Sequence, residues 1–262
     1  MSAIAAFTDK KSAHILSDTA AYDSGGILLG QYAKVATIPH LSAAIAVRGH
    51  YILPQIFAAI VGFRFRSFDD LVADSADFLK DEFANIKSIC GAAHAFDLTL
   101  VGWSNERECM EVYTLANEVN PEQTIAGYEP WVFYQFEGGL SAPLPGFDEQ
   151  AAAGVREGLT PDNFNPSRDA LSWFNAMRRV SRPIIGVDGA SGDAVSPVGG
   201  QAMVTTITRE SISQRVIHDW NDEVGKVIKP DFKVVPPKQT TNIVPISRRQ
   251  RRAMERAARR GR

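Results

Sequence analysis

The stretch SAIAAFTDKKSAHILSDTAAYDSGGILLGQYAKVATIPHLSAAIAVRGH, residues 2–50, decides the fold. Short apolar runs separated by polar turns are typical of β-hairpins. Such runs occur here twice, and they predict strands over residues 2–8, 14–19, 34–38 and 41–47. The chain is therefore expected to open with two hairpins, placed before the first helical pattern.

Three polar residues of this stretch are evenly spaced, because Asp18 follows Ser2 by sixteen residues and Lys34 follows Asp18 by sixteen. A serine hydroxyl is a weak nucleophile until a base takes its proton and a nearby cation favours its ionised form. If Met1 is removed, the α-amine of Ser2, with a reference pKa of about 8, is a suitable base near neutral pH. An ammonium group from Lys34 would favour the alkoxide, and Asp18 would hold that ammonium in place. These residues form a candidate catalytic set.

The chain then alternates between helical and strand patterns. Ser67 and the acidic residue three positions later are typical of a helix N-terminus. The acidic residues of this helix, Asp69, Asp74 and Asp77, are interpreted as a solvated face. Apolar spacing predicts helices over 51–61, 67–89, 148–157 and 167–181, the last capped by Asn165. Strands are predicted over 96–103, 110–115, 129–136, 201–208 and 212–220. A further strand at 184–187 is expected to end in a loop that carries Asp188, Ser191 and Gly192.

Composition is that of a soluble globular protein, with 45% hydrophobic residues and no apolar run of the length of a membrane span. No basic segment followed by an apolar stretch opens the chain, so a cytoplasmic location is expected. Cys90 and Cys109 could be paired or free, but two cysteines form no disulfide framework. Neither the cysteines nor the five scattered histidines suggest a metal site, and no cofactor is expected.

The net charge of −2 conceals an asymmetry between the body of the chain and its end. Residues 247–262 contain eight Arg and one Glu, which leaves 20 basic and 29 acidic residues elsewhere, a net charge of −9. Prolines interrupt the segment just before this tail. We therefore expect a domain over residues 2–225, an extended arm over 226–246 and a disordered tail over 247–262, which could bind an acidic partner or nucleic acid.

The candidate residues Ser2, Asp18, Lys34, Gly49, Asp188 and Ser191, in this order, resemble the pattern of proteasome β-type subunits and their bacterial relatives, which are N-terminal nucleophile (Ntn) hydrolases. The resemblance covers about residues 2–220. It implies an α+β fold, specifically a four-layer αββα sandwich, which the order of the predicted elements also suits. It further implies a homo-oligomer of stacked rings and the possibility of an ATPase partner.

The resemblance implies a role for each of these residues in the cleavage of amide, above all peptide, bonds. Ser2 would be the nucleophile, Lys34 would lower its pKa, and Asp18 would orient Lys34. The backbone N–H of Gly49 would stabilise the oxyanion, while Asp188 and Ser191 would support the site. The chain departs from the family pattern in having Ser in place of the usual Thr. Gly138-Gly139-Leu140-Ser141 is a poor match to the family's further active-site serine.

Two other functions remain open from the sequence. In a non-catalytic assembly subunit of the same fold, Asp18 and Lys34 would be a structural ion pair, and a retained Met1 would do no harm. In a small-molecule amidase of the wider superfamily, the same residues would act without a ring. The state of the N-terminus separates the catalytic functions from the structural one, because a retained Met1 removes the free amine.

Overall fold

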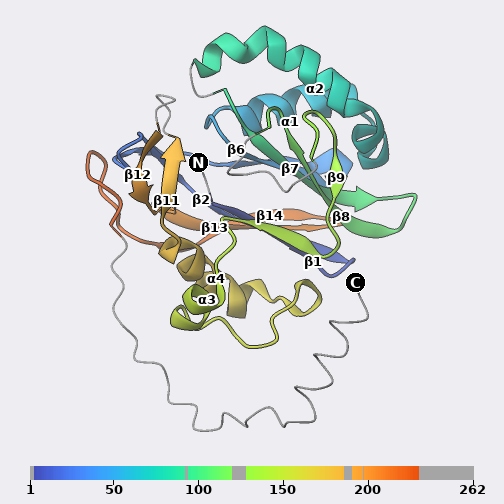
Figure 1. Ribbon diagram of the computed structural model, residues 1–262. Helices are drawn as coiled ribbons and strands as arrows, with labels where there is room; N and C mark the ends of the chain where they lie inside the picture. The colour runs from blue at the N-terminus through green and yellow to red at the C-terminus, as the bar shows by residue number, and fades with distance from the viewer. Residues whose placement is uncertain (1–2, 92–93, 120–127, 186–190, 197, 230–262) are drawn as a thin grey trace, which may run out of the picture. The chain divides into compact units, whose positions relative to one another are not determined.

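The architecture was obtained as a computed structural model that describes residues 3–91, 94–119, 128–185, 191–196 and 198–229. This part of the chain is of the predicted α+β class, with antiparallel sheets and four α-helices (Figure 1). Ser2, Asp188 and most of the predicted arm and tail lie outside the described residues.

The first large sheet is built from strands that are far apart in the sequence. Its order is β10-β1-β2-β13-β14, so the C-terminal hairpin joins the N-terminal one through the pairing of β13 with β2. Phe7 pairs with His14 in β1 and β2, and Leu16 pairs with Val204 in β2 and β13. The strands are β1 (Ile4–Thr8), β2 (Ser12–Asp18), β10 (Gly139–Ala142), β13 (Gln201–Thr208) and β14 (Ile212–Asp219).

The second large sheet consists of neighbours in the sequence, in the order β5-β6-β7-β8-β9. Its strands are β5 (Val35–Ile38), β6 (Ala43–Arg48), β7 (Asp97–Ser104), β8 (Cys109–Ala116) and β9 (Tyr134–Gln135). A 3₁₀ turn, η1 (Pro39–Leu41), joins β5 to β6. Two small hairpins complete the strands: β3 (Ala20–Tyr22) with β4 (Leu28–Gln31), and β11 (Arg182–Ile185) with β12 (Ser191–Val195).

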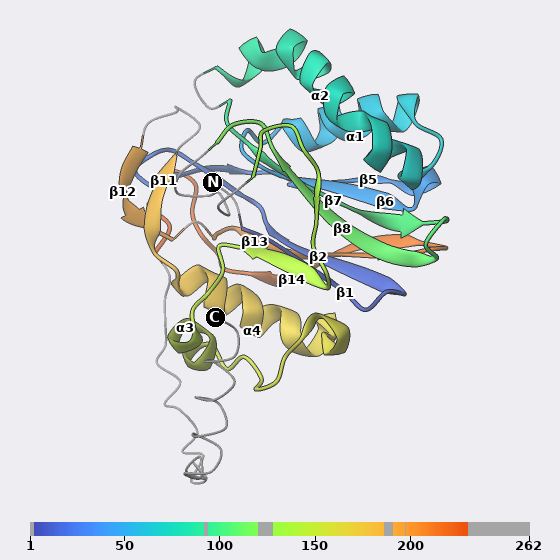
Figure 2. The same ribbon diagram turned by 45° about the vertical axis from the view of Figure 1, so that its right-hand side comes forward.

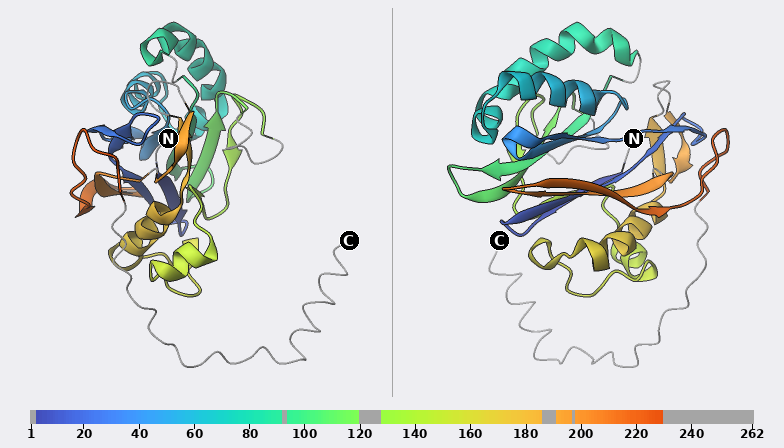
Figure 3. Two further views of the ribbon diagram at one scale, coloured as in Figure 1. Left: turned by 60° about the vertical axis from the view of Figure 1, so that its left-hand side comes forward. Right: turned by 180° about the vertical axis from the view of Figure 1, so that it is seen from behind.

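The two large sheets face each other, and helices cover their outer faces (Figures 2 and 3). Small and branched residues fill the space between the sheets, among them Ile4, Ala44 and Val101. One outer core joins the second sheet to α1 (Leu53–Arg64) and α2 (Phe68–Cys90). The other joins the first sheet to α4 (Pro166–Arg179), beside which lie α3 (Phe147–Ala152) and the 3₁₀ helix η2 (Pro161–Asn163).

Helix ends follow the predicted capping residues. The Ser67 side chain accepts a hydrogen bond of 3.0 Å from the Asp70 N–H, and Asn165 accepts one of 3.0 Å from the Ser167 N–H. Such caps satisfy N–H groups that a first helical turn leaves without partners. No helix among the described residues is long and apolar enough to cross a membrane.

The structure differs from the predicted strands at four places. The strand predicted over 129–136 is reduced to the two residues of β9. The hairpin β3–β4 and the edge strand β10 were not predicted, because both are short and rich in small residues. Ser191 and Gly192 do not belong to a loop: they open β12, in which Ser191 pairs with Ile185.

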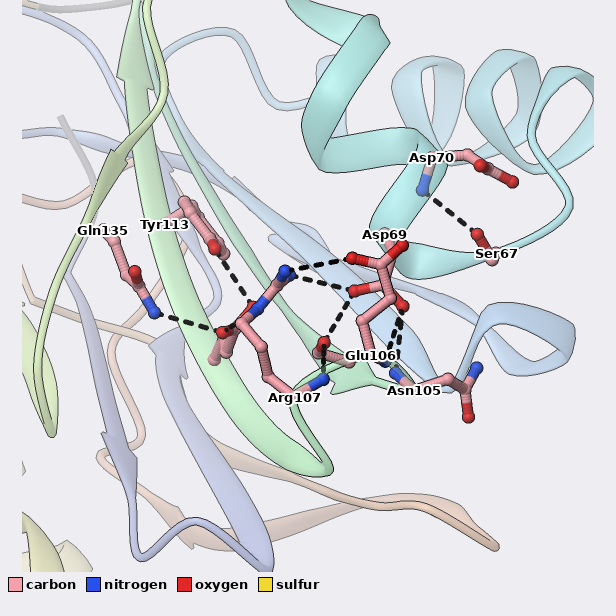
Figure 4. A network of polar contacts seen from close by, with 10 residues as sticks. Ser67, Asp69, Asp70, Asn105, Glu106, Arg107, Tyr113 and Gln135 are labelled. Atoms are coloured by element: carbon pink, nitrogen blue, oxygen red, sulfur yellow. Dashed lines mark hydrogen bonds and ion pairs between the residues drawn. The ribbon is translucent and has the colours of Figure 1, made fainter.

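The prediction of a solvated acidic face on α2 is wrong for Asp69, whose side chain is only 8% exposed. Its carboxylate accepts hydrogen bonds from Ser104 Oγ at 2.6 Å and from Arg107 Nη2 at 2.9 Å, in the turn between β7 and β8 (Figure 4). Arg107 Nε also donates to the buried Glu111 at 2.6 Å. This network attaches the start of α2 to the β7–β8 hairpin. Asp74 and Asp77 are exposed, as predicted.

Candidate active site

Asp18 is the last residue of β2 and is fully buried. Its carboxylate accepts three backbone hydrogen bonds, from the N–H groups of Ala3 at 3.0 Å, Ala20 at 3.2 Å and Gly199 at 3.1 Å. Ala3 immediately precedes β1, Ala20 is the first residue of β3, and Gly199 lies shortly before β13. A buried carboxylate needs such donors to remain charged. Asp18 therefore joins three parts of the chain at one point.

Lys34 lies immediately before β5, and its Nζ is 2.6 Å from Asp18 Oδ1. The two side chains are 3% and 0% exposed, so the ion pair is shielded from solvent. Burial lowers the pKa of Lys34, and the negative charge of Asp18 opposes this shift. The Lys34 ammonium and the Ala3 N–H meet on the same carboxylate oxygen. The predicted pairing of Asp18 with Lys34 is thus present.

Gly49 directly follows Arg48, the last residue of β6. The backbone N–H of Val47 donates to the Lys34 carbonyl at 3.3 Å, which ties the end of β6 to Lys34. A Cβ atom at position 49 would lie 2.7 Å from Phe96 Cβ and 3.0 Å from the Ala95 carbonyl oxygen. Because no side chain fits in this space, position 49 requires glycine for packing, whether or not its N–H takes part in chemistry.

The remaining predicted site residues are only partly placed. Ser2 and Asp188 lie outside the described residues, so the structure gives no position for either. The backbone of Ser191 is described, and Gly192 beside it lies against the loop between β3 and β4. A Cβ atom on Gly192 would be 1.7 Å from the Ser24 carbonyl oxygen. The start of β12 thus contacts the hairpin that follows Asp18.

A second buried ion pair supports the segment that carries Gly199, and it was not predicted. Arg178 of α4 donates to Asp222 at 2.8 Å and to the Val198 carbonyl at 2.7 Å. Asp222 accepts from the Gly200 N–H at 2.9 Å. The residues on both sides of Gly199 are therefore fixed, which directs its N–H toward Asp18. Only the arginine at the end of a helix hints at this role in the sequence.

Tyr22 is a further buried polar residue near the pair. Its hydroxyl has no hydrogen-bond partner among the described residues, and Lys34 Nζ lies 6.0 Å from the centre of its ring. Burial raises the pKa of Tyr22 well above 10, and the charge of Asp18 raises it further. The phenol is therefore neutral at physiological pH and available as a hydrogen-bond donor.

A cavity of about 440 Å³ runs along β10 and is also lined by Arg48, Asp97 and Ala116, at the ends of β6, β7 and β8. Arg48 and Asp97, which line it, are paired at 3.2 Å, and they occupy the last position of β6 and the first of β7. Burial raises the pKa of Asp97, which the charge of Arg48 opposes. Ser141 also lines the cavity, where it accepts a hydrogen bond of 3.2 Å from Trp173 Nε1. Strand registers place this region beside Gly49.

The described residues hold no group of three or more His, Cys, Asp or Glu side chains that could bind a metal ion. Cys90 and Cys109 are both free thiols. The candidate site consists of the Asp18–Lys34 pair, Gly49 and the cavity that Arg48 helps to line.

Compared with models of known protein families and with curated proteins, the chain matches none.

Proposed function

We propose that this chain is an Ntn hydrolase that cleaves amide bonds, above all peptide bonds, with Ser2 as the nucleophile after removal of Met1. The face-to-face sheets with helices on both sides are consistent with the four-layer αββα sandwich of that superfamily. Fold alone does not establish a function, so the proposal depends on the geometry around Asp18.

One observation carries the proposal: Asp18 Oδ1 accepts hydrogen bonds from both the Ala3 N–H, at 3.0 Å, and the Lys34 ammonium, at 2.6 Å. Ser2 is bonded directly to the Ala3 nitrogen. The carboxylate therefore fixes the peptide link of the proposed nucleophile and, with the same oxygen, the cation that would activate it. This contact supports the proposal, because an N-terminal nucleophile needs a cation near its hydroxyl.

The proposed reaction begins with attack of the Ser2 hydroxyl oxygen on the carbonyl carbon of the amide. The hydroxyl proton passes to the Ser2 α-amine, and the Lys34 ammonium stabilises the developing alkoxide. The backbone N–H of Gly49 would stabilise the oxyanion of the tetrahedral intermediate. Expulsion of the amine, which takes up the proton, leaves an ester on Ser2. Water then hydrolyses this ester and releases the acid.

The test combines intact mass, N-terminal sequencing and hydrolysis of fluorogenic peptide amides by the full chain. We expect a chain that begins at Ser2 and an activity that Ser2→Ala abolishes. Lys34→Met is expected to reduce kcat by about 10²–10³-fold, the usual cost of removing one preorganised electrostatic stabiliser. Ser88→Ala, on the exposed surface of α2, is the matched control and should retain full activity.

Two results would refute the mechanism. One is an active chain that retains Met1, since it has no free amine on Ser2. The other is a Ser2→Ala variant with unchanged activity. Size-exclusion chromatography with light scattering on the same samples tests the associated proposal that the protein is a homo-oligomer.

The non-catalytic alternative has an observation in its favour. Asp18 is satisfied by three backbone N–H groups and Lys34, and such a pair would hold the hairpins together even without catalysis. That function predicts that the parent protein hydrolyses no amide and that Ser2→Ala leaves its assembly unchanged. An amidase for small molecules would instead hydrolyse short amides as well as it hydrolyses peptides.

A further inference from the structure

The cavity beside the first sheet has an unusual wall, because all four residues of β10 line it. β10 is an edge strand of the first sheet: Gly139 pairs with Phe7 and Ala142 pairs with Ile4 of β1. No strand pairs with its other edge among the described residues. An edge strand presents a row of backbone donors and acceptors, which is the usual template for the addition of an extended peptide.

The other walls are mainly apolar and aromatic, and include Phe7, Phe136, Leu144, Leu159 and Trp173. The charged residues that line the cavity are Arg48 and Asp97. They are paired with each other, with Arg48 Nη1 3.2 Å from Asp97 Oδ2. The cavity thus offers no net charge to a ligand. A charged side chain would lose its hydration here without gaining a partner, whereas an apolar one would lose nothing.

The place of the cavity relates it to the proposed catalytic residues. Asp97 pairs with Arg48 in the strand register and with Ala116 of β8, so the cavity includes the ends of β6, β7 and β8. Gly49 comes directly after Arg48. Across the gap, Ala142 pairs with Ile4, next to the point where Ala3 contacts Asp18. The volume of about 440 Å³ lies within the usual range of ligand sites.

From these observations we infer that the cavity is the specificity site of the enzyme, where an extended peptide substrate pairs with the open edge of β10 and buries an uncharged aromatic or aliphatic side chain. This inference rests on the proposed function, because the bound peptide is a substrate only if the protein is an enzyme. The binding of the peptide itself does not depend on catalysis. Such a site would favour peptides over small amides as substrates, because only a peptide supplies the backbone groups with which β10 can pair.

The test measures binding by calorimetry, with the full chain carrying Ser2→Ala so that hydrolysis does not interfere. The probes are capped hexapeptides with a central Phe, Lys or Glu, and a Phe peptide whose backbone nitrogens are methylated. We expect the Phe peptide to bind at least about tenfold more tightly than the Lys and Glu peptides, since a good side-chain fit is worth about 10–200-fold. The methylated peptide should also bind about tenfold more weakly, because it has no backbone N–H groups to pair with β10.

Variants locate the binding at the cavity. Leu144→Asp, at a lining residue that is 61% exposed, places a charge at the mouth without disturbing a buried side chain, and should weaken binding of the Phe peptide about tenfold or more. Ala116→Trp, which fills the cavity, should do the same. Ile89→Asp, on α2 and 52% exposed, is the control and should bind like the parent.

Equal binding of the Phe, Lys and Glu peptides, absence of binding by all four probes, or unchanged binding in Leu144→Asp would overturn the inference. These outcomes are distinct from failure of the proposed function. Selective binding by a protein that hydrolyses no amide would support the site and refute the enzyme, whereas hydrolysis without selectivity would do the reverse.

Discussion

Replacing Asp18 with asparagine should destabilise the protein more than replacing Lys34 with methionine, although the two residues form a single ion pair. Asp18→Asn leaves the Lys34 ammonium, 3% exposed, without its anion. Removing one partner from a buried pair costs about 3–5 kcal/mol. In Lys34→Met, Asp18 keeps its three backbone donors, so we expect a loss of about 1–3 kcal/mol.

Urea denaturation measures both losses directly, because the midpoint shifts while the slope stays constant if only stability has changed. For a domain of this size, the Asp18→Asn loss corresponds to a fall in Tm of about 6–20 °C. The double variant should be less unstable than the sum of the single ones, since it contains no unpaired charge. Lys226→Met removes the exposed pair with Glu223, in which both side chains are 66% exposed, and should cost less than about 1 kcal/mol.

The reasoning is refuted if Asp18→Asn costs less than about 1 kcal/mol, or if Lys34→Met is the more damaging change. Additive losses in the double variant would likewise show that the two side chains do not interact.

Three further predictions follow from contacts described above. Gly49→Ala should lower the free energy of unfolding by about 1–3 kcal/mol, because the new Cβ would lie 2.7 Å from Phe96 Cβ. Thermal denaturation measures this loss. The control is Gly91→Ala, where a Cβ meets nothing within 4 Å, so that only the cost of a positive φ remains. Arg107→Ala should destabilise the β7–β8 hairpin by about 1–3 kcal/mol, since it removes two donors from the buried Glu111; hydrogen exchange should show faster opening there than at β13. Burial lowers the pKa values of His14 and His50 below 6.5. The unfolded chain therefore binds more protons than the folded chain as the pH falls below this value, and the free energy of unfolding should decrease toward acid pH. The urea midpoint of the parent should fall more steeply toward acid pH than that of the double variant His14→Gln/His50→Gln.

Local patterns were sufficient to predict most of the elements. The apolar runs of β1 and β2 and the helical spacing of α2 mark surfaces that any packing partner would bury. Ser67 and Asn165 act as caps through groups only two or three residues away. The spacing of Asp18 and Lys34, together with a family resemblance, was enough to predict their pairing.

Contacts between distant parts of the chain could not be predicted in this way. Asp69 is buried by a turn that begins 35 residues later, and no helical pattern carries that information. The support of Gly199 by Arg178 and Asp222 depends on how α4 meets the end of the first sheet. The cavity depends on β10, a four-residue strand of sequence Gly-Leu-Ser-Ala that has little intrinsic β-propensity.

The order of the strands also has a consequence for biosynthesis. The second sheet with α1 and α2 is one continuous part of the sequence, and it can fold while the rest is still being translated. The first sheet cannot be completed until β13 and β14 have been synthesised, because β13 lies between β2 and β14 in the sheet. The hydrogen bond from Gly199 to Asp18 joins groups 181 residues apart. A chain in which β13 has not yet been synthesised would therefore carry Asp18 and Lys34 without the Gly199 donor, and the site would be completed only after residues 199–208 have been added.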